Sequence, residues 1–527
     1  MNFAGKAAAS ADKVRGGYYT PGPVARFLAR WVRDAGPRIV EPSCGDGRIL
    51  RELVKLGGQV HGIELSAREA AKSRRFAPVD AESLFSWLAN APEAEAGGWD
   101  GVAGNPPYIR FGNWASEQRD PALQLMRREG LRPSRLTNAW VPFVVASTVL
   151  ARDGGRVGLV LPAELLQVGY AAQLREFLLS RFSEITLVTF EQLVFDGVLQ
   201  EVVLFCGVVG PGPARMRTVH LSDADALARA DLDTAWAPAL LHEKEKWTKY
   251  FLDPAAIRLL RTLKASPVMT RLGSLADVDV GIVTGRNSFF TFTDAHAGEL
   301  ALRPHCVPLV SRSAQLSGLI YDGDCRAGDL AAGHRTWLLD APVDATDPAL
   351  VAHIAAGEAA GVHRGYKCSI RTPWWTTPSL WVPDLFLLRQ IHRAPRLTVN
   401  AAGATSTDTV HRVRLNPGVD ASSLAAVFHN SVTFAFAEIL GRSYGGGILE
   451  LEPREAEQLP IPPPAQAGAE LACDVDLLLK ANETEKALDL VDRHILIDGL
   501  GLSPDVVDQC RAAWVSLRDR RTKRGSR

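Results

Sequence analysis

Short apolar runs alternate with helix-like stretches between residues 38 and 209. The runs are rich in Val, Ile and Leu and are bounded by turn-forming residues, which is typical of buried strands. The stretches between them carry apolar residues three and four positions apart, which is typical of helices. This alternation predicts an α/β domain with a mostly parallel sheet and helices on both faces. The predicted strands are Arg38–Glu41, Gln59–Glu64, Trp99–Ala103, Gly155–Leu161, Ile185–Phe190 and Glu201–Val209, and the predicted helices are Gly47–Lys55, Ala67–Arg75, Thr137–Ala151 and Tyr170–Ser180.

The last two predicted strands follow each other through a turn at Asp196-Gly197, with no helix of ordinary length between them. A parallel neighbour needs a long crossover connection, whereas an antiparallel one needs only a turn. We therefore expect a hairpin at the end of the sheet, with its final strand antiparallel.

The pattern changes after about residue 210, where helical patches alternate with loops rich in Gly, Pro and Arg. A proline cluster at 460–464 closes this part, and residues 468–520 then carry Leu, Val and Ile at helical spacing. The chain is therefore predicted to have three parts, residues 1–235, 236–465 and 466–527.

Composition and charge narrow the class of protein. The 527 residues suffice for two or three domains. Lys and Arg total 59, as do Asp and Glu, so the chain does not use overall charge to find nucleic acid, and any such surface must be local. The seven cysteines form no Cys-x-x-Cys pair, and we expect no zinc site, other metal site or disulfide framework. Without an apolar leader or an apolar run long enough to span a bilayer, the protein is expected to be cytoplasmic, with no membrane contact.

The tetrapeptide Asn105-Pro106-Pro107-Tyr108 follows the predicted strand Trp99–Ala103. Asn105 offers a side-chain carbonyl oxygen, and Pro106, which has no N–H, offers its backbone carbonyl. Two acceptors aimed at one NH₂ group hold both hydrogens and expose the nitrogen lone pair, while Tyr108 offers a flat face for stacking. Although a Pro-Pro pair also occurs in ordinary loops, ligand sites in open α/β sheets collect at such strand ends. The motif therefore predicts methyl transfer to an amino or amide nitrogen.

A second motif, Glu41-Pro-Ser43-Cys44-Gly45-Asp46-Gly47, follows the first predicted strand and opens a helix. Its glycines permit a tight turn, and the free N–H groups of the helix start suit a small anionic group such as an amino-acid carboxylate. Glu64, at the tip of the second strand, is placed to accept hydrogen bonds from both hydroxyls of a ribose. A dinucleotide-dependent dehydrogenase is the alternative, and the missing third glycine argues against it.

The chain resembles the gamma-class (TaqI-like) adenine-N6 DNA methyltransferases of type II restriction–modification systems. The resemblance rests on four segments that occur in the family's order: Gly17-Tyr18-Tyr19-Thr20-Pro21, Glu41–Gly47, Glu64 and Asn105–Tyr108. Gly281–Phe290 and Gly445–Pro453 look, more loosely, like segments of the larger members. The resemblance implies a class I S-adenosylmethionine-dependent methyltransferase, with a Rossmann-like, mostly parallel seven-stranded sheet and a C-terminal α+β domain. Residues 1–235 would be the catalytic domain, 236–465 the DNA target-recognition domain and 466–527 a helical segment.

The resemblance also implies roles for individual residues. Thr20 and the Ser43–Gly45 backbone would hold the methionine end of S-adenosylmethionine, Glu41 would lie beside its amino group, and Glu64 would bind its ribose. The family's acid that reads the cofactor adenine is replaced by Ser83, and Asp80 is the nearby alternative. The cofactor-binding set is thus Tyr19, Thr20, Pro21, Glu41, Ser43, Cys44, Gly45, Glu64, Leu65 and Ser83, and the catalytic set is Asn105, Pro106, Pro107, Tyr108 and Phe195, with Phe195 expected on the other face of the base.

A local excess of positive charge lies in the second half of the chain. Between residues 361 and 415, eight Lys and Arg against two Asp give +6 in a chain of zero net charge, with Trp374 and Trp375 among them. Cations interleaved with aromatics suit DNA contact, although a solvated face around two core tryptophans fits the same pattern. The basic tail 511–527 is expected to be a frayed helix, either solvated or against phosphate. The predicted DNA contacts are Arg286, Asn287, Arg371, Trp374, Trp375 and Arg396.

The expected function is methyl transfer from S-adenosylmethionine to N6 of an adenine flipped out of double-stranded DNA, by a monomer that protects host DNA in a restriction–modification system. A separate cognate endonuclease as a partner is left open. Three alternatives remain: methylation of an RNA base or a protein glutamine, a single-chain restriction–modification enzyme, and a catalytically inactive DNA-binding protein.

Overall fold

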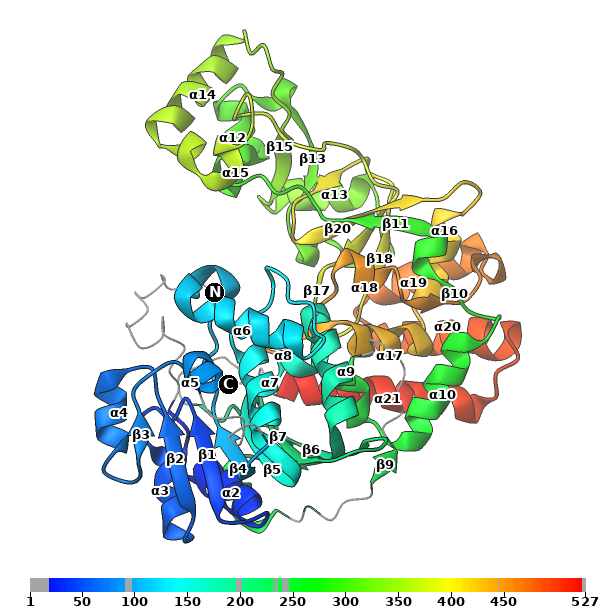
Figure 1. The fold of residues 1–527 in the computed structure, drawn as a ribbon. Coiled ribbons are helices and arrows are strands. Elements are labelled where there is room, and N and C mark those ends of the chain that lie inside the picture. Colours follow the sequence, from blue (N-terminus) through cyan, green and yellow to red (C-terminus); the bar gives the residue numbers. More distant parts are fainter. Residues whose placement is uncertain are drawn as a thin grey trace. The chain divides into compact units, whose positions relative to one another are not determined.

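The computed structural model describes residues 19–90, 97–195, 201–230, 232, 236–238, 246–444 and 446–523, and the chain divides into two compact units (Figure 1). The first unit extends to Phe251 and also includes Lys523, and the second runs from Leu252 to Thr522. Each is described by itself.

The first unit is built on a mixed sheet with the strand order β3-β2-β1-β4-β5-β7-β6-β8-β9. All six predicted strands are present, and β7 lies antiparallel between β5 and β6, which confirms the predicted final hairpin. Two further strands extend the sheet beyond the seven expected, because β8 pairs parallel with β6 and β9 pairs antiparallel with β8. The strands are β1 Arg38–Pro42, β2 Gln59–Ile63, β3 Val79–Asp80, β4 Trp99–Gly104, β5 Ala151–Pro162, β6 Phe182–Phe190, β7 Val202–Val209, β8 Arg215–Leu221 and β9 Ala237–Pro238.

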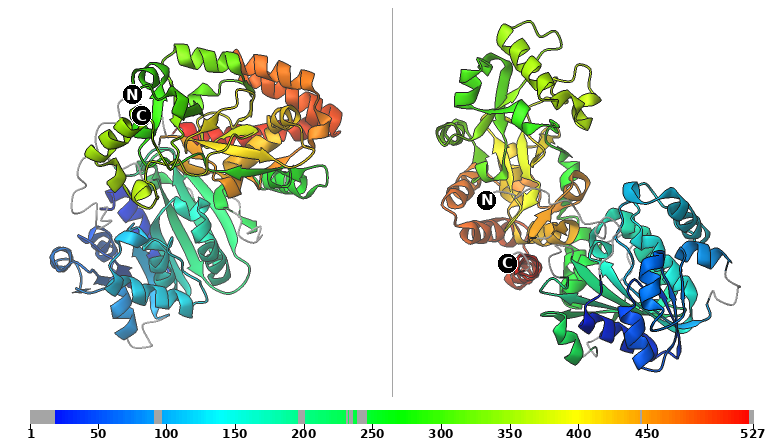
Figure 2. Two further views of the ribbon diagram at one scale, coloured as in Figure 1. Left: turned by 90° about the horizontal axis from the view of Figure 1, so that it is seen from above. Right: turned by 90° about the vertical axis from the view of Figure 1, so that its left-hand side faces the viewer.

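Helices cover both faces of this sheet, as predicted; Figure 2 gives two further views. Helix α2 packs on β4, β5 and α3, and α7 packs on β4 and β5 from the other side. Apolar residues of α2 and β1 are buried in one core, whereas α7 is apolar nearly all round and buried accordingly. The helices are α2 Gly22–Arg33, α3 Arg48–Lys55, α4 Ala67–Ser73, α5 Leu84–Asn90, α6 Ser116–Arg128, α7 Trp140–Leu150, α8 Glu164–Gln167 and α9 Ala172–Arg181.

The strand order reverses between β1 and β4. β1 pairs in parallel with β2 on one side and with β4 on the other, with Glu41 opposite Gly62 and Val40 opposite Val102. The carboxyl ends of these three strands therefore meet at one edge of the sheet, which is where open α/β sheets bind their ligands.

The second unit is an α+β arrangement, as predicted for the C-terminal part. It contains a five-stranded sheet (β11-β20-β16-β18-β14), a four-stranded sheet (β12-β15-β13-β19) and two smaller ones (β17-β22-β21 and β10-β23). The strands are β10 Thr270–Arg271, β11 Ala276–Asp279, β12 Thr291–Thr293, β13 Cys306–Val310, β14 Ile320–Tyr321, β15 Arg335–Leu339, β16 Leu385–Leu388, β17 Gln390–Ile391, β18 Leu397–Asn400, β19 Thr405–Ser406, β20 Val410–Leu415, β21 Arg442–Tyr444, β22 Ile448–Glu450 and β23 Pro460–Ile461. The helices are α10 Pro254–Ala265, α11 Asn287–Phe290, α12 Asp294–Glu299, α13 Gly323–Ala331, α14 Pro348–Ala359, α15 Tyr366–Ser369, α16 Ala421–Phe428, α17 Ser431–Leu440, α18 Pro453–Ala456, α19 Ala469–Lys480, α20 Thr484–Val491 and α21 Pro504–Lys523.

Helix α21 corrects the expectation of a frayed basic tail, because its arginines have partners inside the second unit. Arg521 is 3% exposed and donates to both carboxylate oxygens of Glu438, at 2.7 and 3.0 Å. The same guanidinium donates to the backbone carbonyls of Ile391 and His392. The positive charge of this helix is therefore partly internal and holds the unit together.

Among the described residues, no single helix is long and apolar enough to cross a membrane. Helices α16 and α17 reach that length and composition only as a pair, bent by 76° at the break between them.

The pair Arg521–Glu438 generates a stability prediction. Replacing Arg521 by Ala leaves the Glu438 carboxylate buried without its partner, so the free energy of unfolding should fall by about 3–5 kcal/mol. The measurement is urea unfolding followed by circular dichroism. Lys486→Ala is the control, because this exposed lysine pairs with Glu483 on the surface and should cost under about 1 kcal/mol. Equal losses in the two variants would contradict the structural role of Arg521.

Candidate functional site

The loop between β1 and α3 turns through left-handed backbone conformations. Ser43, Gly45 and Gly47 have φ of 59°, 55° and 80°. A Cβ at Gly47 would come within 3.0 Å of Phe76 and Ser73, whereas one at Gly45 would meet nothing within 4 Å. The loop thus packs tightly on one side at Gly47, and it leaves open space at Gly45 for a ligand.

Glu64 fixes this loop from the end of β2. Its Oε2 accepts the N–H of Gly45 at 2.9 Å, and its Oε1 accepts the N–H of Ser66 at 2.8 Å. The next residue, Leu65, is 52% exposed. A carboxylate oxygen has room for more than one donor. Glu64 can therefore position the loop and still accept a hydroxyl hydrogen.

Glu41 is a buried carboxyl group at the end of β1. It is 3% exposed, and its Oε2 has no hydrogen-bond partner among the described residues. Burial raises the pKa of Glu41 well above its ordinary value, and repulsion from Asp46 and Glu64 raises it further. Because an unpaired buried carboxylate is costly, the side chain is suited to meet a cationic group such as an ammonium.

The Asn105–Tyr108 segment leaves the end of β4 and contacts both the N-terminal segment and the cofactor loop. The Asn105 side-chain amide donates to Thr20 Oγ1 at 3.3 Å, and Ser43 Oγ lies 3.4 Å from the Asn105 carbonyl oxygen. The Tyr108 hydroxyl lies 3.0 Å from the carbonyl oxygen of Val160 and 3.3 Å from Asn105 Oδ1. Threonine, loop and tetrapeptide are thus brought together, and the amide of Asn105 is oriented with its nitrogen towards Thr20.

Phe195 lies in the same hydrophobic cluster against which the half-buried Tyr108 packs. It is 6% exposed, and it is the last described residue before the gap at 196–200. Both aromatic residues expected beside the base thus belong to, or pack against, the same core cluster.

The remaining predicted cofactor residues surround this loop. Tyr19 donates to Glu69 Oε2 at 3.4 Å, and Pro21 immediately precedes α2. Cys44 is buried, and its backbone N–H donates to the carbonyl of Ile63. Tyr18, which belongs to the motif that suggested Tyr19, lies outside the described residues.

The turn between β3 and α5 was expected to read an adenine through Ser83 or Asp80. Asp80 Oδ2 accepts from His61 Nε2 at 2.9 Å and from Trp87 Nε1 at 2.8 Å, so this oxygen is already engaged. The Ser83 carbonyl accepts the backbone N–H of Trp87. Glu82, between the two, is a further acid of this turn that the sequence reasoning missed. The sequence did not show where the helix after this turn begins. Because α5 starts at Leu84, Glu82 lies in the turn just before it.

The residues predicted to contact DNA divide into two groups. Arg371 donates to the backbone carbonyls of Thr284 and Val283, at 2.9 and 2.7 Å, and Arg396 donates to that of Leu316. Trp374 and Trp375 are half-buried and donate to Glu358 Oε1 and the Pro342 carbonyl. Arg286 and Asn287, in contrast, are exposed at the start of α11. Much of the local positive charge counted in the sequence is thus engaged inside the unit.

Two more cations of the basic stretch are engaged in the same way. Arg412 is 2% exposed and pairs with Asp279 at 3.2 Å, and Arg389 pairs with Glu450 and Glu452. In the described part of the chain, no group of three His, Cys, Asp or Glu side chains could hold a metal ion.

The fold is that of a class I methyltransferase. It is defined by the strand order of the sheet together with a glycine turn after β1, an acid after β2 and a polar tetrapeptide after β4. The comparisons with known proteins identify the family. The model of the Eco57I restriction-modification methylase matches residues 58–195, and that of the C-terminal domain of the type II methyltransferase M.Eco57I matches residues 244–496. The chain belongs to this family of type II restriction–modification methyltransferases, in agreement with the resemblance to the gamma class.

Individual relatives match over most of the chain. The type II methyltransferase M.XamI of Xanthomonas campestris pv. amaranthicola is 24% identical, with 85% of each chain covered. M.AccI of Acinetobacter calcoaceticus is 20% identical, with 83% of each covered. Among solved structures, the type IIL restriction-modification enzyme MmeI in complex with DNA is similar in fold, with a TM-score of 0.60 and 12% identity over 94% of this chain and 75% of that one.

The burial of Glu41 generates a pH prediction. With its pKa raised above 4.5 in the folded state, the folded protein holds a proton that the unfolded chain has lost, so stability falls as pH rises from about 4.5 through the folded pKa. Glu41→Gln removes this titration. Without added ligand, the melting temperature of the variant should therefore rise relative to that of the wild type as the pH increases above about 4.5.

Glu52→Gln is the matched control with the opposite sign. Burial alone would raise the pKa of Glu52, but hydrogen bonds from Lys55 and Arg51 lower it overall. This variant should therefore lose stability relative to wild type at neutral pH. Parallel pH profiles for wild type and Glu41→Gln would contradict the assignment of Glu41 as a buried acid with one unpartnered oxygen.

Proposed function

We propose that this protein is a site-specific DNA methyltransferase that transfers a methyl group from S-adenosylmethionine to N6 of an adenine flipped out of double-stranded DNA. The observation that carries the proposal is the arrangement of Asn105, whose amide is oriented by Thr20 at the end of β4, beside the loop held by Glu64. Membership of the family supports the coarser part, a DNA methyltransferase. Adenine, its N6 and the cofactor are inferred from the residues.

The residues at the ends of β1 and β2 fit S-adenosylmethionine. Glu41 has an unpartnered, buried oxygen suited to the ammonium group of the methionine part. The open space at Gly45 lies where the loop backbone would approach that part, and Glu64 can accept from the ribose hydroxyls. Glu82 and Ser83 are the side chains we assign to the adenine, because an oxygen of Asp80 is engaged by His61 and Trp87. When bound, the cofactor supplies a methyl group on a positively charged sulfur, which is an electrophile.

The chain's own residues would prepare the nitrogen to be methylated. Asn105 Oδ1 and the Pro106 carbonyl each accept one hydrogen of the amino group, which turns its lone pair out of conjugation with the ring. Thr20 contributes by holding the amide nitrogen of Asn105, so that the oxygen is presented to the base. The protein thus provides alignment, with no covalent enzyme intermediate.

Taking a base out of a duplex costs a few kcal/mol. Stacking contributes about 1–3 kcal/mol per base, and Tyr108 and Phe195 are the aromatic residues to which we assign it. These two side chains would therefore offset part of the cost of flipping.

In the second unit, we assign DNA contact to Arg286 and Asn287, which are exposed where the loop enters α11. Arg371 is a positioning residue for this loop, because it donates to the carbonyls of Val283 and Thr284 within it. The Cys368 thiol also contacts the Thr284 carbonyl, at 3.8 Å. The segment is thus held from behind, and Asn287 Oδ1 accepts from the buried Thr284 hydroxyl at 2.5 Å, which leaves the exposed Arg286 and the Asn287 amide nitrogen for contact with phosphate and base edges. Arg396, whose guanidinium binds the Leu316 carbonyl, is better explained by packing within the unit.

The proposal is tested by supplying the protein with methyl-labelled S-adenosylmethionine and genomic DNA that lacks adenine methylation. The label should enter DNA as N6-methyladenine at one sequence context, read by digestion to nucleosides and by methylation mapping. Parallel reactions with RNA and with a protein extract separate the alternative substrates. Label in RNA or protein and none in DNA would overturn the proposal, and Mg²⁺-dependent cleavage of the same DNA would identify a combined nuclease.

Asn105→Ala should reduce methyl transfer by at least about 10²-fold, because one of the two acceptors that orient the amino group is lost. Binding of DNA and of S-adenosylmethionine should remain within a few-fold of wild type. Single-turnover kinetics and equilibrium titrations measure the two properties. Asn90→Ala, at an exposed asparagine that ends α5, is the matched control and should turn over normally. Retained turnover in Asn105→Ala would refute the role of this side chain.

A further inference from the structure

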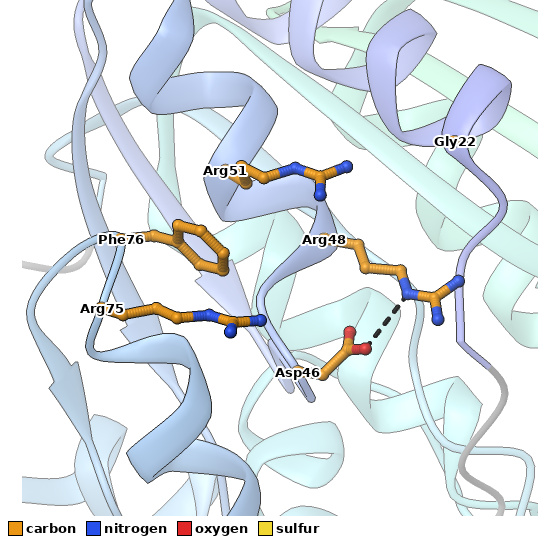
Figure 3. Close-up of a pocket in the computed structure, with 6 residues that line it drawn as sticks. All are labelled: Gly22, Asp46, Arg48, Arg51, Arg75 and Phe76. Carbon is orange, nitrogen blue, oxygen red and sulfur yellow. Dashed lines mark hydrogen bonds and ion pairs between the residues drawn. The ribbon is translucent and has the colours of Figure 1, made fainter.

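An arginine-lined pocket lies beside the cofactor loop and is not explained by methyl transfer. It has a volume of about 280 Å³ and is lined by Gly22, Asp46, Arg48, Arg51, Arg75 and Phe76. Figure 3 shows the side chains of Arg51 and Arg75 reaching into this space from α3 and from the segment after α4, with Asp46 and Arg48 next to them. None of these six residues is assigned to the cofactor or to the base.

The pocket gathers positive charge that is only partly neutralised. Three guanidinium groups face one carboxylate, that of Asp46, which Arg48 contacts at 3.1 Å. Arg51 pairs with Glu52, which Lys55 also contacts. Arg75 lies over the ring of Phe76 at 4.6 Å and has no carboxylate partner among the described residues. Cations that line one pocket repel one another, and an anion bound between them would offset that repulsion.

The shape and chemistry of the pocket suit a phosphate group. Planar guanidinium groups donate paired hydrogen bonds that match phosphate oxygens, and they stay charged at any ordinary pH. The apolar face of Phe76 closes one wall, so that an anion would be partly shielded from water. The pocket is also anchored: Gly47 packs against Phe76 and Ser73, and Ser73 Oγ donates to the Gly45 carbonyl.

We propose that Arg51 and Arg75, with Arg48, form a phosphate-binding site on the first unit, separate from the methyl-transfer site. The phosphate is either a backbone phosphodiester of DNA or the phosphate of a small free anion. The DNA source rests on the proposed function, whereas the free anion does not.

The test compares Arg51→Gln/Arg75→Gln with Arg30→Gln/Arg68→Gln. The second pair removes the same charge from the same unit at exposed positions outside the pocket. Arg48 is left unchanged because it contacts the Thr20 carbonyl and the Tyr19 ring. Arg75→Gln alone serves if the double variant fails to fold. One arm measures binding of duplex DNA across a range of salt concentrations, and the other measures the melting temperature with inorganic pyrophosphate.

If the source is DNA, the pocket variant should bind duplex more weakly, with a slope of log K against log salt shallower by about 1–2, because each lost phosphate contact removes about 0.9. If the source is a free anion, pyrophosphate should stabilise the wild type and the control but not the pocket variant, with DNA binding unchanged. Equal behaviour of pocket and control variants in both arms would overturn the inference.

Assays of methyl transfer on the same preparations separate this inference from the proposed function. If pyrophosphate binding depends on Arg51 and Arg75 but the protein transfers no methyl label to DNA, the proposed function is contradicted and the phosphate site is supported. If DNA is methylated normally and the pocket variants change neither DNA binding nor stabilisation by pyrophosphate, only the phosphate site is contradicted.

Discussion

The parallel pairing of β1 with β2 and β4 is the constraint on which the rest of the site depends. Parallel strands end at the same edge, so the pairing delivers Glu41, Glu64 and Asn105 to one place although they are far apart in the chain. Each then has a different environment. Glu41 is buried without a partner for one oxygen, Glu64 binds two backbone N–H groups, and Asn105 is oriented by Thr20. A shift in strand register would move these side chains to the wrong face of the sheet.

The first unit was largely predictable from the sequence because its signals are local. A strand, a glycine turn and the start of a helix are contiguous in Glu41–Gly47, and the tetrapeptide directly follows its strand. The strands β8 and β9 were missed for the opposite reason. β8, with the sequence Arg-Met-Arg-Thr-Val-His-Leu, carries too few apolar residues in a row, and β9 has only two residues. Both are specified by pairing with the existing edge of the sheet, which depends on tertiary structure.

The arginines of the second unit show why charge could not be interpreted from the sequence alone. Arg371, Arg412 and Arg521 belong to basic stretches, yet each donates to the unit's own backbone carbonyls or carboxylates. A sequence shows the sign of a charge but not the partner, and the partner can be a carbonyl group that any residue type provides. Exposure in the structure separates Arg286 from these internal cations, and the same criterion singles out Arg75 in the first unit.

The contact between Thr20 and Asn105 has a consequence for how the tetrapeptide can vary during evolution. A threonine hydroxyl both donates and accepts, so it can hold an amide nitrogen in this chain and would hold a carboxylate oxygen equally well. The contact with Thr20 therefore favours a planar side chain of this length at position 105. It can form whether the terminal atom that faces Thr20 is a nitrogen or an oxygen. The threonine at position 20 could thus hold either an asparagine or an aspartate at position 105.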